Sequence, residues 1–191
     1  MSEPSPEQVE RASRIRLLLM DVDGVWTDGN LFYVPGPGGD MVEVKLSHAH
    51  DGQALRWLHA SGLPSGLISG RDSPVVTHRA EMLGMSYIYQ GFLEKIPPYE
   101  EICAAAGVSD REVAYLGDDL PDIPLIDRVG LGVAVANGRV EVKQRADYIT
   151  TARGGSGAIR EVVELIMKAN GTWGAVLTRY GVGTGGEHRR Q

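Results

Sequence analysis

The chain is poor in cysteine, has no excess of basic residues and has no long apolar run. Cys103 is the single cysteine among 191 residues, so no internal disulfide can form and no oxidising compartment is required. Cys103 lies in an Ala-rich stretch, which favours a small structural thiol over a nucleophile. Lys and Arg number 19 against 25 Asp and Glu, which argues against a general nucleic-acid binder.

Hydrophobicity along the chain also excludes some classes of protein. No window approaches the roughly 18 apolar residues that a transmembrane helix requires. The N-terminus is polar and lacks the apolar run of a signal peptide. We therefore expect a cytoplasmic protein that binds neither nucleic acid nor membrane.

Short apolar runs alternate with helical patterns along most of the chain. This alternation predicts an α/β protein with a largely parallel sheet and right-handed crossovers. In such sheets ligands bind beyond the carboxyl ends of the strands. We expect strands at 15–20, 66–68, 87–89, 113–116, 131–136 and 148–150, and helices at 51–61, 73–83, 95–106 and 158–169.

One segment departs from the alternation. Leu31–Val34 and Met41–Leu46 flank the sequence PGPGGD, whose Pro and Gly content marks a turn. We expect a β-hairpin, over about residues 26–47, projecting from the first strand. The chain then divides into a polar N-terminal extension at 1–14, one domain at 15–170 and a mobile Gly-rich tail at 171–191.

The first expected strand runs directly into an acidic pair, Asp21 and Asp23, within DVDG. Residues two apart at a strand end can project in the same direction. Such a pair can bind a hard divalent cation and can supply a nucleophile and a proton carrier. Acidic turn residues are common, so this pair alone is weak evidence.

A second acidic cluster follows another expected core strand. Asp118, Asp119 and Asp122 come directly after residues 113–116. Carboxylates gathered at one sheet edge repel one another and burial raises their pKa values, unless a cation is bound. Magnesium suits an all-oxygen site that also takes a substrate phosphate. The competing interpretation, helix N-caps at Asp119 and Asp122, explains each residue singly but not the pairing of two clusters.

Two further polar residues follow strands or precede helices. Ser69 ends a third strand within ISGR, where its hydroxyl and the next backbone N–H groups can hold a phosphate. Lys95 stands just ahead of a helix and could neutralise a transferring phosphoryl group. Taken alone, the serine is an everyday turn residue and the lysine a solvated one.

The order DVDG, ISGR, a lysine and GDDLPD, each after an expected strand, resembles the haloacid dehalogenase superfamily of phosphotransferases. The resemblance implies a Rossmann-like, three-layer α/β/α fold. It implies Asp21 as nucleophile and Asp23 as general acid and base, with phosphate contacts from Ser69 and Lys95. The implied ligands of Mg²⁺ are Asp21, the backbone carbonyl of Asp23 and Asp118, with Asp119 or Asp122 supporting bound waters.

Longer strings, among them DVDGVWTDG, ISGRDSPVVTHR and AYLGDDLPDIPLI, are similar to a capless subfamily, the 3-deoxy-D-manno-octulosonate 8-phosphate phosphatases. Neither residues 24–69 nor residues 71–95 leave room for an inserted cap domain. The resemblance implies lipopolysaccharide precursor synthesis and a homotetramer in which a neighbour's hairpin helps close each active site. An arginine at the sugar-binding site would bind the substrate carboxylate through two parallel hydrogen bonds. The implied sugar-binding positions are Asp51, Gly52, Arg56, Gly70, Arg71 and Arg79.

The chain departs from the subfamily just before Asp51. Ser47, His48 and His50 stand where the subfamily usually has Phe, Asn and Arg. Both histidines could face the ligand and, when protonated, replace the missing arginine. They could equally be exposed hairpin residues. Phosphates of nine-carbon 2-keto sugar acids, or a broader range of small metabolites, are therefore alternative substrates to the eight-carbon sugar-acid phosphate.

Two other classes of protein remain to be separated from a phosphatase. A response-regulator receiver also carries a phosphoaspartate, but it would lack the acid at Asp23, because its phosphoaspartate must be hydrolysed slowly. A degenerate scaffold would be expected to have lost part of the set. The set of Asp21, Asp23, Ser69, Lys95 and Asp118 is intact, which favours an enzyme.

Overall fold

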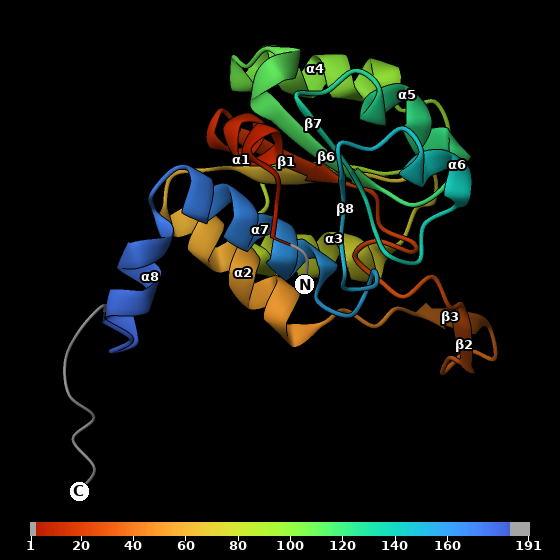
Figure 1. Ribbon diagram of the computed structural model, residues 1–191. Coiled ribbons are helices and arrows are strands. Elements are labelled where there is room, and N and C mark those ends of the chain that lie inside the picture. Colours follow the sequence, from red (N-terminus) through yellow and green to blue (C-terminus); the bar gives the residue numbers. More distant parts are fainter. Residues whose placement is uncertain (1–2, 184–191) are drawn as a thin grey trace, which may run out of the picture.

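The computed structural model describes residues 3–183 and shows a parallel sheet between two layers of helices (Figure 1). The six strands run in the order β5-β4-β1-β6-β7-β8, and all five pairings are parallel. This confirms the expected three-layer fold. The strands are β1 (Leu17–Met20), β4 (Ser65–Ile68), β5 (Tyr87–Tyr89), β6 (Val113–Gly117), β7 (Leu131–Ala134) and β8 (Tyr148–Ile149).

The central strand β1 explains why the sheet takes this arrangement. All four of its residues are buried, as a strand covered on both faces requires. Leu18 and Met20 face a core cluster formed with α1, α2, α3, α7 and α8, whereas Leu17 and Leu19 face a second cluster formed with α4, α5 and α6. The first layer consists of α1 (Pro6–Ser13), α2 (Ala49–Ala60), α3 (Pro74–Leu83), α7 (Ala158–Ala169) and α8 (Trp173–Arg179), and the second of α4 (Ile96–Ala106), α5 (Ile123–Ile126) and α6 (Val140–Lys143).

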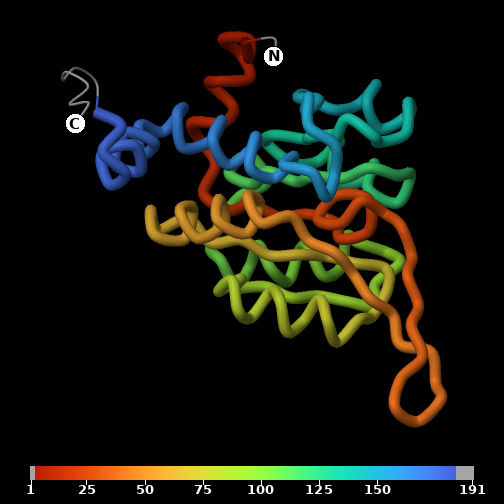
Figure 2. Tube along the Cα trace, turned by 90° about the horizontal axis from the view of Figure 1, so that it is seen from below, coloured from red at the N-terminus to blue at the C-terminus, as the bar shows by residue number. Residues whose placement is uncertain are grey.

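The hairpin is formed by β2 (Phe32–Pro35) and β3 (Met41–Val44), which pair antiparallel. It extends away from the body of the molecule, as the views of Figures 1 and 2 agree. Most of its large apolar side chains are exposed. The position therefore matches the hairpin expected at about residues 26–47.

The N-terminal segment, expected as a polar extension, contains a docked helix. Ser5 caps α1 and forms a capping box with Gln8. The Gln8 amide donates to the Asp147 carbonyl, and the Arg11 guanidinium donates to the Gly130 carbonyl. These polar contacts, which hydrophobic patterning does not reveal, tie residues 6–13 to the domain.

The C-terminal tail expected at 171–191 also begins with a helix. Trp173 of α8 packs edge-on against Trp57 of α2, and the Arg160 guanidinium lies 5.4 Å from the Trp173 ring centroid. Aromatic and cation–π contacts of this kind order a segment whose glycine content suggested mobility. Residues 184–191 lie outside the described residues. Across residues 3–183, no helix has both the length and the apolar character to cross a bilayer.

Candidate active site at the carboxyl edge of the sheet

The carboxyl ends of β1, β4 and β6 meet around one cavity of about 330 Å³. Parallel neighbours bring segments far apart in the sequence to the same sheet edge. The cavity therefore gathers the residues predicted for phosphate and metal binding. It is lined by Asp21, Asp23, Ser69, Gly70, Arg71, Leu93, Lys95, Asp118, Asp119, Pro121 and Asp122.

The loop that leaves β1 passes very close to Asp118, and Gly24 makes this possible. Gly24 has a φ of 95°, in the region that favours glycine. A Cβ at this position would lie 2.2 Å from the Asp118 carboxylate Oδ2. The Gly24 carbonyl also accepts a hydrogen bond from the Asn137 amide at 3.0 Å. The glycine in DVDG thus lets the two acidic segments approach each other.

Lys95 is the buried cation at the centre of the site. Its Nζ donates to Asp21 Oδ1 and to Asp122 Oδ1, both at 2.6 Å, and to the Tyr115 hydroxyl at 3.1 Å. An ammonium has three protons, so each can serve one of these acceptors. Burial opposes the charge on Lys95, but Asp21 and Asp122 outweigh it and raise the Lys95 pKa.

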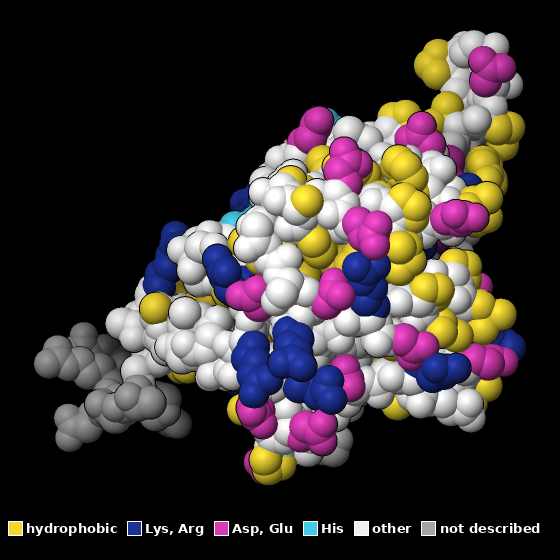
Figure 3. Space-filling view, turned by 90° about the horizontal axis from the view of Figure 1, so that it is seen from above, with side chains coloured by type: hydrophobic (Ala, Val, Ile, Leu, Met, Phe, Trp, Pro, Cys, Tyr) yellow, Lys and Arg dark blue, Asp and Glu magenta, His cyan; other side chains and the backbone are white. Residues whose placement is uncertain are grey.

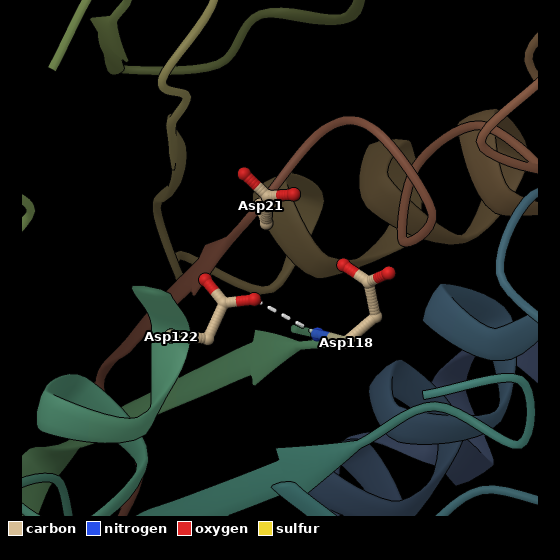
Figure 4. Close-up of side chains that lie close together, drawn as sticks. All are labelled: Asp21, Asp118 and Asp122. Carbon is tan, nitrogen blue, oxygen red and sulfur yellow. Dashed lines mark hydrogen bonds between the residues drawn. The ribbon is translucent and has the colours of Figure 1, made fainter. Parts of the chain in front are cut away.

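Three carboxylates converge at this point (Figure 4). One oxygen from each of Asp21, Asp118 and Asp122 lies within 4.8 Å of the others. Burial raises the pKa of Asp21 to about 6, with Lys95 acting in the opposite direction. Burial, followed by the charges of Asp21 and Asp122, raises the Asp118 pKa to about 7. Buried carboxylates that lie this close together repel one another when ionised, and such clusters are typical of a site for a divalent cation.

Asp122 and Asp119 also have local structural roles. Asp122 Oδ1 accepts from Lys95 and from the Tyr115 hydroxyl, and Oδ2 accepts from the backbone N–H groups of Asp118 and Asp119. Asp119 caps the 3₁₀ helix Leu120–Asp122 by accepting from the Leu120 N–H at 2.8 Å. The N-cap interpretation raised for Asp119 therefore describes its geometry, and Asp122 fixes the loop that carries Asp118.

Asp23 and Ser69 also line this cavity. Asp23 is partly exposed and forms an ion pair with Lys45 of the hairpin. Ser69 is buried, and its hydroxyl accepts from the Arg71 N–H at 3.2 Å. The start of the turn after β4 therefore places the Ser69 hydroxyl beside the cavity, where it could contact a phosphate.

Within one chain, His48, His50 and Asp51 lie away from the cavity that Asp21 lines. His48 and His50 contact each other edge-on at 5.0 Å and line a separate cavity of about 860 Å³ beside α7. The Asp51 carboxylate is fully buried and accepts from the N–H groups of Gly157 and Arg160, at 3.2 and 2.7 Å. Asp51 thus stabilises the beginning of α7, a different role from the sugar contact that the resemblance implied.

Gly52, Arg56 and Arg79 are not at the cavity of Asp21 either. Gly52 lies against the Arg79 guanidinium, since a Cβ there would be 2.9 Å from Arg79 Nη2. Arg79 lines a third cavity, of about 180 Å³, which it shares with Lys45. Arg56 is exposed on α2. Of the implied sugar-binding positions, only Gly70 and Arg71 line the acidic cavity in one chain.

Three residues of this region had no predicted role. Lys45 and Glu43 come from β3 and its end, and Tyr115 lies in the middle of β6. Glu43 and Lys45 are two apart, so strand periodicity alone places them on one face. That signal was available in the sequence. A hydroxyl in the middle of an apolar strand carried no comparable signal.

A buried aspartate beside a lysine, a second aspartate two residues on and a further acidic loop can together transfer a phosphoryl group. The fold and the site define the haloacid dehalogenase-like class of hydrolases. A sequence profile of the haloacid dehalogenase-like hydrolase family matches residues 68–161.

Related proteins belong to the same class and narrow it to one family. The chain is 41% identical over 161 residues to a 3-deoxy-D-manno-octulosonate 8-phosphate phosphatase of Yersinia pestis, covering 84% of each protein. The crystal structure of a probable YrbI family phosphatase from Pseudomonas syringae pv. phaseolica has 42% identity and a TM-score of 0.88, covering 94% of this chain and 100% of that one. The chain belongs to the 3-deoxy-D-manno-octulosonate 8-phosphate phosphatase family.

A third relative was solved with ligands. The 3-deoxy-D-manno-octulosonate 8-phosphate phosphatase of Moraxella catarrhalis, in complex with a magnesium ion, a phosphate ion and a KDO molecule, has 38% identity and a TM-score of 0.86. The match covers 91% of this chain and 98% of that one.

Proposed function

We propose that the protein is a Mg²⁺-dependent phosphomonoesterase that hydrolyses 3-deoxy-D-manno-octulosonate 8-phosphate to the free sugar acid and phosphate. The reaction would serve lipopolysaccharide precursor synthesis, in the cytoplasm. The observation that carries the proposal is the buried contact between Asp21 and Lys95 beside Asp118. The relative that was solved with magnesium, phosphate and KDO supports the choice of substrate.

The chain's own residues divide the chemistry between them. Asp21 attacks phosphorus while Asp23 gives a proton to the departing sugar oxygen, which leaves the phosphoryl group on Asp21. Asp23 then takes a proton from water as this water attacks the same phosphorus and frees Asp21. Lys95 neutralises charge on the transferring group, and Ser69 with the next N–H groups holds its oxygens.

The acidic residues fit a bound Mg²⁺. Asp21 and Asp118 supply carboxylate oxygens that protein hydrogen-bond donors do not fully occupy, so these oxygens can bind the cation. We assign the backbone carbonyl of Asp23 as a third ligand. Asp119 and Asp122 lie where they could support bound water, although both oxygens of Asp122 already accept two donors each. When bound, the cation stabilises negative charge on the transferring phosphoryl oxygens.

Phosphate release from a panel of phosphates, with and without Mg²⁺, tests this function. We expect the eight-carbon sugar-acid phosphate to give the highest kcat/KM, and chelation of Mg²⁺ to abolish release. A higher kcat/KM for a nine-carbon 2-keto sugar-acid phosphate would establish the alternative substrate. Equal values across unrelated small-molecule phosphates would indicate a broad-specificity phosphatase. No turnover of any phosphate would contradict the proposal as a whole.

We further propose that copies of the chain assemble, as a homotetramer in which a neighbour's hairpin closes each active site. Seven large apolar side chains of the hairpin region are 44–61% exposed: Leu31, Phe32, Tyr33, Val34, Met41, Val42 and Leu46. Figure 3 shows hydrophobic side chains gathered along the projecting hairpin. An isolated two-stranded hairpin is marginally stable in water, so this surface needs a partner.

Substitution of the apolar hairpin surface should separate the subunits. We expect the Phe32→Asp/Met41→Asp variant to be monomeric by light scattering at micromolar concentration, because two buried charges would oppose association. Met82→Asp is the matched control, since Met82 is 55% exposed on α3 and lies outside the hairpin. A monomeric wild type with full specific activity would show that the hairpin needs no partner.

The raised carboxyl pKa values predict how Mg²⁺ and pH act together on stability. Asp21 and Asp118 have folded-state pKa values of about 6 and 7, against 3.8 ordinarily. Between the ordinary and the raised pKa values, the folded state binds more protons than the unfolded state. The free energy of unfolding of the metal-free protein therefore falls as pH rises. Mg²⁺ requires the ionised carboxylates. We therefore expect Mg²⁺ to raise the Tm more at about pH 8 than at about pH 5.5.

Melting curves with and without Mg²⁺ at the two pH values measure this effect. Taking the difference at each pH removes the contribution of groups that Mg²⁺ does not touch. Asp118→Asn should lose most of the pH-dependent gain, because the amide neither ionises nor binds Mg²⁺ well. A gain that is the same at both pH values would show that neither carboxylate competes with protons for the metal.

A further inference from the structure

Asp23 belongs to a closed ring of four alternating charges. Asp23 Oδ1 pairs with Lys45 Nζ, and Asp23 Oδ2 lies 3.7 Å from Arg71 Nε. Glu43 completes the ring, with Oε1 paired to Arg71 Nη2 and Oε2 lying 3.7 Å from Lys45 Nζ. In each carboxylate, therefore, one oxygen faces Lys45 and the other faces Arg71.

The ring joins three segments that meet only in the folded protein. Asp23 comes from the loop after β1, Glu43 and Lys45 come from β3 and its end, and Arg71 comes from the turn after β4. The Arg71 guanidinium also donates to the Tyr33 hydroxyl of β2 at 3.4 Å. Both strands of the hairpin are thus tied to the residue that is proposed to handle the proton.

Lys45 is the member whose position is most constrained. Its side chain is 5% exposed, against 43% for Arg71. A surface ion pair contributes little because water screens it and both side chains are mobile, whereas a buried lysine is held in one place. Lys45 can therefore fix the orientation of the Asp23 carboxylate. Without it, Asp23 and Glu43 would lose the more buried of the two cations that lie between them.

We propose that Lys45, supported by Glu43, is a positioning residue that holds the Asp23 carboxylate where it can exchange a proton with the leaving group. The proposal rests on the proposed function, and it gives the hairpin a second role besides contact between subunits. A proton donor must lie within hydrogen-bond reach of the oxygen that it protonates, so a freely turning Asp23 would be a poorer acid.

Two substrates that differ in leaving group test the ring. A simple alkyl phosphate, glycerol phosphate, needs a protonated leaving oxygen, whereas p-nitrophenyl phosphate needs almost no help. We expect Lys45→Met to lower kcat on glycerol phosphate about 10²-fold and on p-nitrophenyl phosphate less than about threefold, because general acid catalysis matters only for the poor leaving group. KM should stay within about twofold for both. Lys45→Arg should restore most of the loss, and Glu43→Gln should show a smaller loss of the same selectivity.

A double-mutant cycle separates positioning from other roles. If Lys45 acts through Asp23, adding Lys45→Met to Asp23→Asn should cost nothing further. Lys168→Met, on the exposed side of α7 and outside both the ring and the hairpin, is the matched control and should match wild type. Light scattering on every variant excludes loss of assembly.

Three results would overturn the ring's role: equal losses on both substrates, a higher KM with unchanged kcat, or additive losses in the double variant. Failure of the proposed function is separate, since it would appear as a wild type without activity on sugar-acid phosphates.

Discussion

Asp21→Asn should release phosphate more than about 10⁴-fold more slowly than wild type, because an amide cannot attack phosphorus and removal of a nucleophile costs this much elsewhere. The variant should still fold. Burial disfavours the ionised Asp21 carboxylate, as its raised pKa of about 6 shows, so removing this charge should cost little stability. Lys95 is the residue that loses a charged partner. Lys95 retains Asp122 as a partner.

The decisive measurement is phosphate release together with intact mass after rapid quenching. Wild type should show a phosphoryl adduct during turnover, and Asp21→Asn should show none. Asp127→Asn is a matched control, since Asp127 follows α5 and pairs with Arg145 on the surface. Turnover by Asp21→Asn within tenfold of wild type would remove Asp21 from the nucleophile role.

Lys95→Met should lose both activity and stability. The ammonium is the cation between Asp21 and Asp122, and its side chain is 5% exposed. We expect kcat to fall by about 10³-fold, since a positioned charge of this kind is worth that much in a water-excluded site. We expect the free energy of unfolding to fall by about 3–5 kcal/mol, because removing the lysine leaves the buried carboxylates without their cation.

The two effects are measured separately, by phosphate release at saturating substrate and by denaturant unfolding without Mg²⁺. Lys168→Met is the control, since Lys168 is exposed on α7 and pairs with Glu164. Lys95→Arg keeps the charge and should recover stability better than activity, because a guanidinium cannot point three N–H bonds at these acceptors. A Lys95→Met variant that unfolds as wild type does would show that the carboxylates do not need this cation.

The sheet and the acidic cavity could be predicted because each depends on a local pattern. The apolar run ending at Met20 identified the central strand, and the acidic residues directly after it and after β6 had to meet at one edge of a parallel sheet. The class of protein followed from the order of these segments. It did not depend on any contact between side chains.

Contacts that depend on side-chain direction could not be predicted in the same way. Asp51 was expected at the sugar, but its carboxylate points to the N–H groups of α7, which lies more than a hundred positions further along the chain. The α1 helix was hidden because its anchors, Gln8 and Arg11, are polar. Lys45 became visible only once the hairpin and the loop after β1 were in place.

The position of β1 in the sheet also matters while the protein is being made. β1 is the first strand of the parallel sheet to be synthesised, yet its neighbours on either side are β4 and β6, paired at Leu18 with Ser65 and at Leu17 with Val113. At a synthesis rate of roughly 5–20 residues per second, Leu17 waits roughly 5–20 seconds before Val113 exists. Through that interval an apolar strand has an open edge, which is a template for aggregation. We expect nascent chains that end before β6 to be a preferred target of chaperones, and nucleotide changes that slow translation between β4 and β6 to lower the yield of folded enzyme.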